Sequence, residues 1–70
     1  MSAQLKINGE VQTFHEGLPE TLAALLDKLK IDAATVVAEI DGSIIERKAF
    51  EQTSLSEGQS IELIRFVGGG

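Results

Sequence analysis

The residues best placed to do chemistry are three consecutive glycines, Gly68, Gly69 and Gly70, at the carboxyl end of the seventy-residue sequence. Glycine lacks a Cβ atom and adopts nearly all backbone conformations, so such a segment can enter a channel too narrow for side chains. At roughly 3.3 to 3.6 Å per residue, the segment would reach about 10 Å beyond the residues before it, enough to bring the carboxyl group of Gly70 into another protein's active site. The same three residues are also typical of a frayed chain end, which does no chemistry.

Composition leaves few other sources of chemistry. The chain has no cysteine, so it offers no thiol nucleophile, no disulfide and no cysteine metal site. His15 is the single histidine and is better explained as a solvated side chain than as a metal ligand. Glu39 and Asp41 flank a predicted turn, where carboxylates are more often surface charge than a catalytic pair. We therefore predict no metal site and no catalytic side chain.

Charge and the amino end bear on partners and location. Eleven acidic residues against six basic ones give a formal net charge of −5, which disfavours nucleic acid and anionic membranes as partners. The opening residues, Met1 to Gln4, form neither a basic region nor an apolar stretch, so no signal peptide or membrane span is predicted. We expect a soluble, cytoplasmic protein that is a monomer when free.

Two hairpins are predicted from alternating apolar residues and turn dipeptides. Residues 4–14 alternate around Asn8-Gly9, a dipeptide that suits a type I′ turn because both central positions need positive φ. Residues 36–45 form the second hairpin around Asp41-Gly42. Together the hairpins would supply four short strands of one small sheet.

A helix is predicted between the hairpins, from Pro19 to about Leu29. Proline suits the first helical position, because its missing N–H would have no partner there. Five leucines fall on one stripe that would pack on one face of the sheet: Leu18, Leu22, Leu25, Leu26 and Leu29. Residues 46–54 lack a clean period, so they are predicted to be irregular, with a short helical turn near Phe50. Phe50 and Leu55 would fill the core there.

The final strand is predicted over residues 61–67 and leads directly into the glycines. If Ile61 and Leu63 point into the core, alternation turns Ile64 and Phe66 outward. The opposite phase would bury Ile64 and Phe66 instead. We favour the first phase, because the glutamate between Ile61 and Leu63 belongs to a residue type that is rarely fully buried.

The outward residues of this strand would form an apolar patch of the kind that marks a partner surface. Four residues are predicted to contact a partner: Ile64, Arg65, Phe66 and Val67. Arg65 would pair with an acidic group of the partner or lie along the sheet. Residues 1–67 would form one domain and residues 68–70 a flexible tail.

Four segments of the sequence carry a resemblance to a known family. They are Leu5–Glu10 (LKINGE), Thr21–Leu26 (TLAALL), Asp41–Arg47 (DGSIIER) and, most strongly, Gly58–Gly70 (GQSIELIRFVGGG). Over its whole length the chain resembles the ubiquitin-like, β-grasp sulfur carrier proteins of the bacterial thiamine pathway. A di-glycine end is shared by many ubiquitin-like proteins, whereas an end reading Phe-Val-Gly-Gly-Gly on a chain of this size is closer to the thiamine carriers. The departures from the family's usual residues, at Glu46, Phe50 and Gln59, concern partner contacts rather than the tail.

The resemblance implies an α+β fold, in which a mixed sheet packs on one main helix. It also implies that the Gly70 carboxylate is adenylated by a ubiquitin-activating-type enzyme and converted to a thiocarboxylate, whose sulfur passes to the thiazole ring on thiazole synthase. Gly68 and Gly69 would give access to both active sites. The sulfur would come from a donor such as a cysteine desulfurase.

The chain itself would be a carrier and not an enzyme. ATP and Mg²⁺ would belong to the activating partner, because no lysine, threonine or helix follows the glycines to form a phosphate-binding loop. Two other functions remain open. One is the small subunit of molybdopterin synthase, whose members are usually longer. The other is a protein modifier joined to lysines through Gly70.

Overall fold

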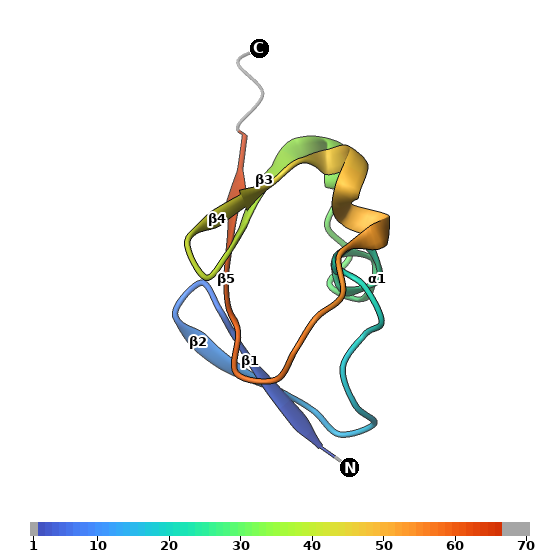
Figure 1. Ribbon diagram of the computed structural model, residues 1–70, viewed down its shortest axis with the longest axis vertical. Helices are drawn as coiled ribbons and strands as arrows, with labels where there is room; N and C mark the ends of the chain where they lie inside the picture. Colours follow the sequence, from blue (N-terminus) through green and yellow to red (C-terminus); the bar gives the residue numbers. More distant parts are fainter. Residues whose placement is uncertain (1, 67–70) are drawn as a thin grey trace.

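Residues 2–66 form a five-stranded sheet with one α-helix packed on one of its faces (Figure 1). This is seen in a computed structural model, which describes residues 2–66. The strands are β1 (Ala3–Ile7), β2 (Glu10–Phe14), β3 (Val36–Ile40), β4 (Ser43–Ile45) and β5 (Ser60–Arg65). Their order across the sheet is β2-β1-β5-β3-β4, and β5 is parallel to β1 but antiparallel to β3. The sheet is therefore mixed, as predicted, with β5 at its centre.

Both predicted hairpins are confirmed, and their turns have the backbone conformation that the sequence indicated. Asn8 and Gly9 have φ values of 51° and 83°, and Asp41 and Gly42 have φ values of 50° and 88°. Asparagine, aspartate and glycine are the residues that tolerate positive φ at low cost. Each turn thus contains two residues, and the strands that it joins are antiparallel neighbours.

The predicted start of the helix at Pro19 is wrong, because α1 spans Leu22–Lys28. Thr21 is the N-cap: its backbone is extended, and its Oγ1 accepts a hydrogen bond from the Ala24 N–H at 3.1 Å. The Leu22 N–H donates to the Thr53 carbonyl at 2.9 Å, so the chain before α1 is held against the segment that precedes β5. These contacts supply partners for two N–H groups that the first turn of a helix leaves open.

The carboxyl end of α1 is closed by a Schellman motif without glycine. Lys30 has a φ of 60°, the Ile31 N–H donates to the Leu26 carbonyl at 2.9 Å, and the Lys30 N–H donates to the Asp27 carbonyl at 3.1 Å. This pair of bonds satisfies carbonyls that the last turn would leave open. A lysine in this left-handed conformation is less favourable than a glycine would be.

The described part of the chain also contains two 3₁₀ segments. They are η1 (Ala33–Thr35) and η2 (Arg47–Gln52). The first follows its N-cap Asp32, whose carboxylate accepts a hydrogen bond from the Ala34 N–H at 2.9 Å. The second confirms the predicted helical turn near Phe50, which is buried in the core, while Leu55 is partly buried against it.

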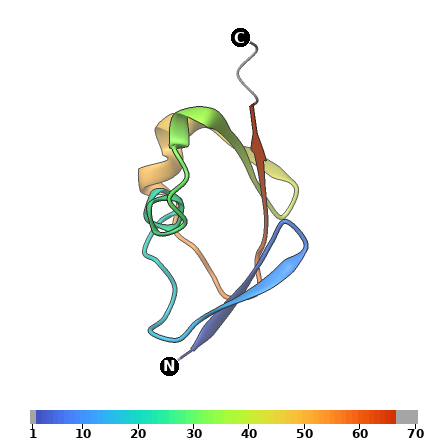
Figure 2. The same ribbon diagram turned by 180° about the vertical axis from the view of Figure 1, so that it is seen from behind.

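The core lies between α1 and the face of the sheet that we call the inner face. It includes three of the five leucines of the predicted stripe, and the other two, Leu18 and Leu29, pack at its edge. Its members are Leu5, Ile7, Phe14, Leu22, Leu25, Leu26, Val36, Ala38, Ile40, Phe50, Ile61 and Leu63. The opposite face, the outer face, is covered by no helix within residues 2–66 (Figure 2). This is the α+β layout expected of a β-grasp domain.

Candidate functional site

The predicted reactive end of the chain lies outside the described residues. Val67, Gly68, Gly69 and Gly70 are not among residues 2–66, so their predicted roles as contact, access and reactive groups stay predictions. The structure does describe the strand that leads to them. β5 ends at Arg65, two residues short of the predicted end, and Phe66 follows it. In both views the end of β5 lies at the opposite end of the molecule from the start of β1 (Figures 1 and 2).

The predicted phase of β5 is confirmed. Ile61 and Leu63 are buried on the inner face, whereas Ile64 and Phe66 are 52% and 55% exposed. The register with β3 explains this arrangement, because Ile61 lies opposite Ile40 and Leu63 lies opposite Ala38, both of which are core residues. The outer face of β5 therefore presents large apolar side chains immediately before the glycines.

A second strand extends this apolar surface. Val37 of β3 lies opposite Ile64 on the outer face and is half-buried. Thr35 lies opposite Phe66, whose N–H donates to the Thr35 carbonyl at 2.8 Å and so continues the β3–β5 pairing beyond the end of the strand. The hydrogen bond holds the backbone of Phe66 against the body of the protein.

Ile44 is a surface residue that the sequence interpretation did not single out. It lies on β4, is 68% exposed and, through the pairing of β4 with β3, lies opposite Glu39 on the outer face. Val37, Ile44 and Phe66 line one hollow of about 350 Å³ at this edge of the sheet. We call Val37, Ile44, Ile64 and Phe66 the outer patch. The signal in the sequence was the pair Ile44-Ile45, because alternation must turn one of two adjacent strand residues outward.

Arg65 does not share the face of the outer patch. It lies opposite the buried Val36 in the β3–β5 register, which places it on the inner side of the sheet, and its side chain is exposed. A partner that contacts Ile64 on the outer face would reach Arg65 only if it also extended around the end of the sheet. The structure therefore separates Arg65 from the apolar residues with which it was grouped.

Side chains from the two hairpin turns hold β5 in place. The Asn8 Oδ1 accepts a hydrogen bond from the Leu63 N–H at 2.7 Å, and the Asp41 Oδ1 accepts one from the Ser60 N–H at 2.9 Å. Both acceptors belong to residues with positive φ, so the same two residues shape the turns and bind the central strand. The Asp41 carboxylate, which was considered above as one half of a pair with Glu39, therefore makes a structural contact.

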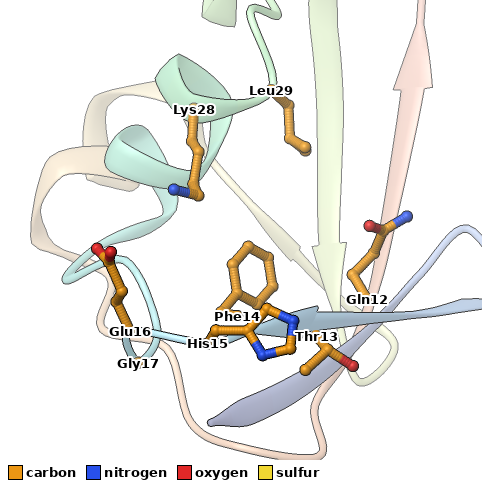
Figure 3. A pocket seen from close by; sticks show the side chains of 8 residues that line it. All are labelled: Gln12, Thr13, Phe14, His15, Glu16, Gly17, Lys28 and Leu29. Carbon is orange, nitrogen blue, oxygen red and sulfur yellow. The ribbon is translucent and has the colours of Figure 1, made fainter. Parts of the chain in front are cut away.

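A hollow of about 430 Å³ lies beside β2 (Figure 3), and no residue of the outer patch lines it. Phe14 and His15 lie on one side of it, and Lys28 and Leu29, at the end of α1, lie on the other. His15 is exposed, in keeping with a solvated side chain. Within residues 2–66, no group of three histidine, cysteine, aspartate or glutamate side chains is arranged to hold a metal ion.

The part of the chain that the structure describes contains no helix long and apolar enough to cross a membrane.

Two solved structures superpose on nearly the whole of this chain. A crystal structure of the thiamine biosynthesis protein ThiS from Geobacter metallireducens superposes with a TM-score of 0.82 at 34% sequence identity, covering 96% of this chain and 99% of that one. An NMR structure described as a thiamine biosynthesis protein from the same organism superposes with a TM-score of 0.79, covering 87% of that chain. The predicted β-grasp, ubiquitin-like fold is confirmed.

Curated relatives by sequence are of two kinds. A thiazole synthase from Paramagnetospirillum magneticum is 33% identical over 67 residues, which are 96% of this chain but only 20% of that protein. The chain thus spans about a fifth of the length of this relative. An uncharacterised protein, ycf40, from Porphyra purpurea is 30% identical over 66 residues and is covered over 90% of its length. The model of the ThiS family matches residues 5–70, and the chain belongs to this family.

Proposed function

We propose that this protein is a sulfur carrier of thiamine biosynthesis that acts through the carboxyl group of Gly70. The observation that carries the proposal is the family match, which extends through the glycines to Gly70. The similarity to solved structures named as thiamine biosynthesis proteins supports the same pathway. No catalytic group is required of the chain, because its role is to present a terminus to enzymes.

The proposed chemistry takes place in three steps on the partner enzymes. A Gly70 carboxylate oxygen bonds to the α-phosphorus of ATP, and the bond to the departing pyrophosphate breaks, which leaves an acyl adenylate. A sulfur nucleophile then attacks the acyl carbon, and AMP leaves with its bonding electrons. A free carboxylate is a poor electrophile, so the adenylate supplies the leaving group that the second step needs. ATP and Mg²⁺ bind to the activating enzyme. A donor such as a cysteine desulfurase would supply the sulfur as a persulfide, so that the attack forms an acyl disulfide. A thiol would then reduce the S–S bond of this acyl disulfide, which releases the thiocarboxylate.

The outer patch is the proposed contact surface for the activating enzyme. Ile64 and Phe66 immediately precede the segment that must enter the active site, and Val37 and Ile44 extend the apolar area across two neighbouring strands. Exposed apolar area of this kind marks surfaces that a partner covers. Val67 continues the same contact toward the glycines, and Arg65 contributes from the other side of the sheet end.

Thiazole synthase is the proposed acceptor of the sulfur. The support is that a relative named thiazole synthase contains a segment similar to nearly all of this chain. When a carrier domain is joined to the enzyme that consumes its sulfur, the effective concentration of the carrier at the active site of that enzyme is raised.

The proposal is tested by ATP–pyrophosphate exchange, which reports adenylation directly. We expect the full chain to stimulate exchange by an adenylating enzyme of the thiamine pathway and the chain lacking Gly70 not to do so. Both chains should unfold at the same urea concentration, because within residues 2–66 the last core residue is Leu63. Equal exchange with the shortened chain would contradict the role of Gly70.

A further inference from the structure

Two glutamates face each other on the outer face of the sheet. In the antiparallel register of β3 and β5, Glu39 lies directly opposite Glu62. Side chains in such pairs have Cβ atoms about 4.5 to 5.5 Å apart, and like charges in this arrangement destabilise a sheet. Glu62 is exposed and Glu39 is half-buried, so both carboxylates can be reached from outside. We call Glu39 and Glu62 the acid pair.

The acid pair lies within the surface that the proposed function assigns to a partner. The next outward pair toward the glycines is Val37 with Ile64, and the neighbour of Glu39 on β4 is Ile44. Lys6 is the basic residue nearest in register on β1, but it lies opposite Ser60, two residues before Glu62 along β5. Within residues 2–66, no side-chain hydrogen bond of the structure involves either carboxylate of the pair.

Covering this surface changes the energetics of the acid pair. In the free protein, water solvates both carboxylates and weakens their repulsion. A partner that covers Val37, Ile44 and Ile64 removes water from their immediate surroundings. Desolvated charges are costly unless they gain an opposite charge and hydrogen bonds. A wholly apolar partner surface would therefore bind poorly here, whereas one that carries a cation at this position would bind well.

We propose that the activating enzyme places one arginine side chain against Glu39 and Glu62 while its apolar residues cover the outer patch. The inference rests on the proposed function, and it specifies which chemical groups the partner places against this surface. A guanidinium group suits the position because its five N–H donors form a planar fork that can bond to carboxylate oxygens on two sides. The ammonium group of lysine is a more strongly hydrated point charge and a weaker match to two acceptors.

The proposed contact with arginine predicts an effect on the free protein that would not be seen if the acid pair had a structural role. Removing one charge of the pair relieves repulsion, so Glu62→Gln should keep or slightly raise the urea midpoint of unfolding. The same change should weaken binding to the enzyme, because the arginine loses one of its two partners. Affinity would then fall with no loss of stability, which a general defect in folding cannot produce.

The test measures the affinity of a purified thiamine-pathway adenylating enzyme for the full chain by calorimetry at two salt concentrations. We expect Glu39→Gln/Glu62→Gln to weaken binding on the order of tenfold or more and to reduce its salt dependence. Glu57→Gln is the matched control, because it removes the same charge from an exposed turn before β5, and it should bind within about twofold of wild type.

Three results would overturn the inference. If the wild-type chain binds but the double variant binds equally well, the acid pair has no role, while the proposed function stands. If Glu57→Gln weakens binding as much as the double variant does, the effect is general attraction between opposite net charges and not a specific site. If the wild-type chain neither binds the enzyme nor stimulates its exchange reaction, the inference and the proposed function both fail.

Discussion

The two faces of β5 carry similar apolar side chains, but those on one face are buried in the core and those on the other are exposed. Ile61 and Leu63 point inward and are buried against α1 and neighbouring strands, while Ile64 and Phe66 point outward and remain about half exposed. Adjacent positions on one strand thus divide between holding the fold together and presenting a surface. The comparison teaches that stability and partner binding should be separable by single substitutions in this strand.

The largest expected effect is on the inner face. Ile61→Ala should lower the free energy of unfolding by about 2 to 5 kcal/mol, because it removes buried methyl and methylene groups and leaves a cavity. This loss is a large part of the stability of so small a domain. Urea unfolding followed by circular dichroism measures the change. Ile64→Ala is the matched control on the outer face and should change the stability by less than about 0.5 kcal/mol; equal losses would contradict the division between faces.

The next largest effect concerns function on the outer face. Phe66→Ala should lower kcat/KM for adenylation of the chain by about tenfold, since aromatic anchors contribute most where a partner covers them. The measurement is ATP–pyrophosphate exchange at subsaturating carrier concentration. Val11→Ala is the control, because Val11 is 62% exposed on the distant edge strand β2. If Val11→Ala were as damaging as Phe66→Ala, the outer patch would not be the contact surface.

A smaller effect is expected where a turn binds the central strand. Asn8→Gly keeps positive φ available but removes the Oδ1 that accepts from the Leu63 N–H, so it should destabilise the protein by about 1 kcal/mol. Asn8→Asp keeps an acceptor oxygen and should retain most of the stability. Hydrogen exchange of the Leu63 amide should accelerate only in the glycine variant, and unchanged exchange there would argue against the contact.

The smallest effect is a gain in stability at the end of α1. Lys30 has a φ of 60°, a conformation in which glycine is less strained than lysine. Lys30→Gly should therefore raise the free energy of unfolding by up to about 1 kcal/mol. Lys28→Gly is the contrasting change, because Lys28 is in the helix, where glycine should destabilise by a similar amount. Thermal unfolding of both variants measures the two opposite shifts.

The sequence predicted the parts of the fold that local chemistry decides. Asn8-Gly9 and Asp41-Gly42 determine their turns through the φ values that they tolerate, and alternation then fixed which residues of β5 face inward. The start of α1 was missed because it is set by the Thr21 side-chain cap, which the leucine spacing does not reveal, and by a contact with a distant segment. Thr53 binds the first turn through its backbone, and no periodicity within residues 18–29 reveals that contact.

The candidate site was predictable to a similar degree. Exposure of Ile64 and Phe66 followed from the pattern of one strand. The contribution of Ile44 and the opposition of Glu39 to Glu62 depend on how β4, β3 and β5 are aligned, and strand alignment is set by tertiary packing rather than by any single segment. The role of Gly70 came from the resemblance, and it lies outside the described residues.

The most direct test of the account is the intact mass of the full chain after incubation with its adenylating enzyme, ATP and a sulfur donor. We predict that one oxygen is replaced by sulfur and that fragmentation places the sulfur on the carboxyl group of Gly70. Phe66→Ala should slow this conversion while the chain stays folded. An unchanged mass, or Gly70 joined to lysines of other proteins in place of a thiocarboxylate, would contradict the carrier function.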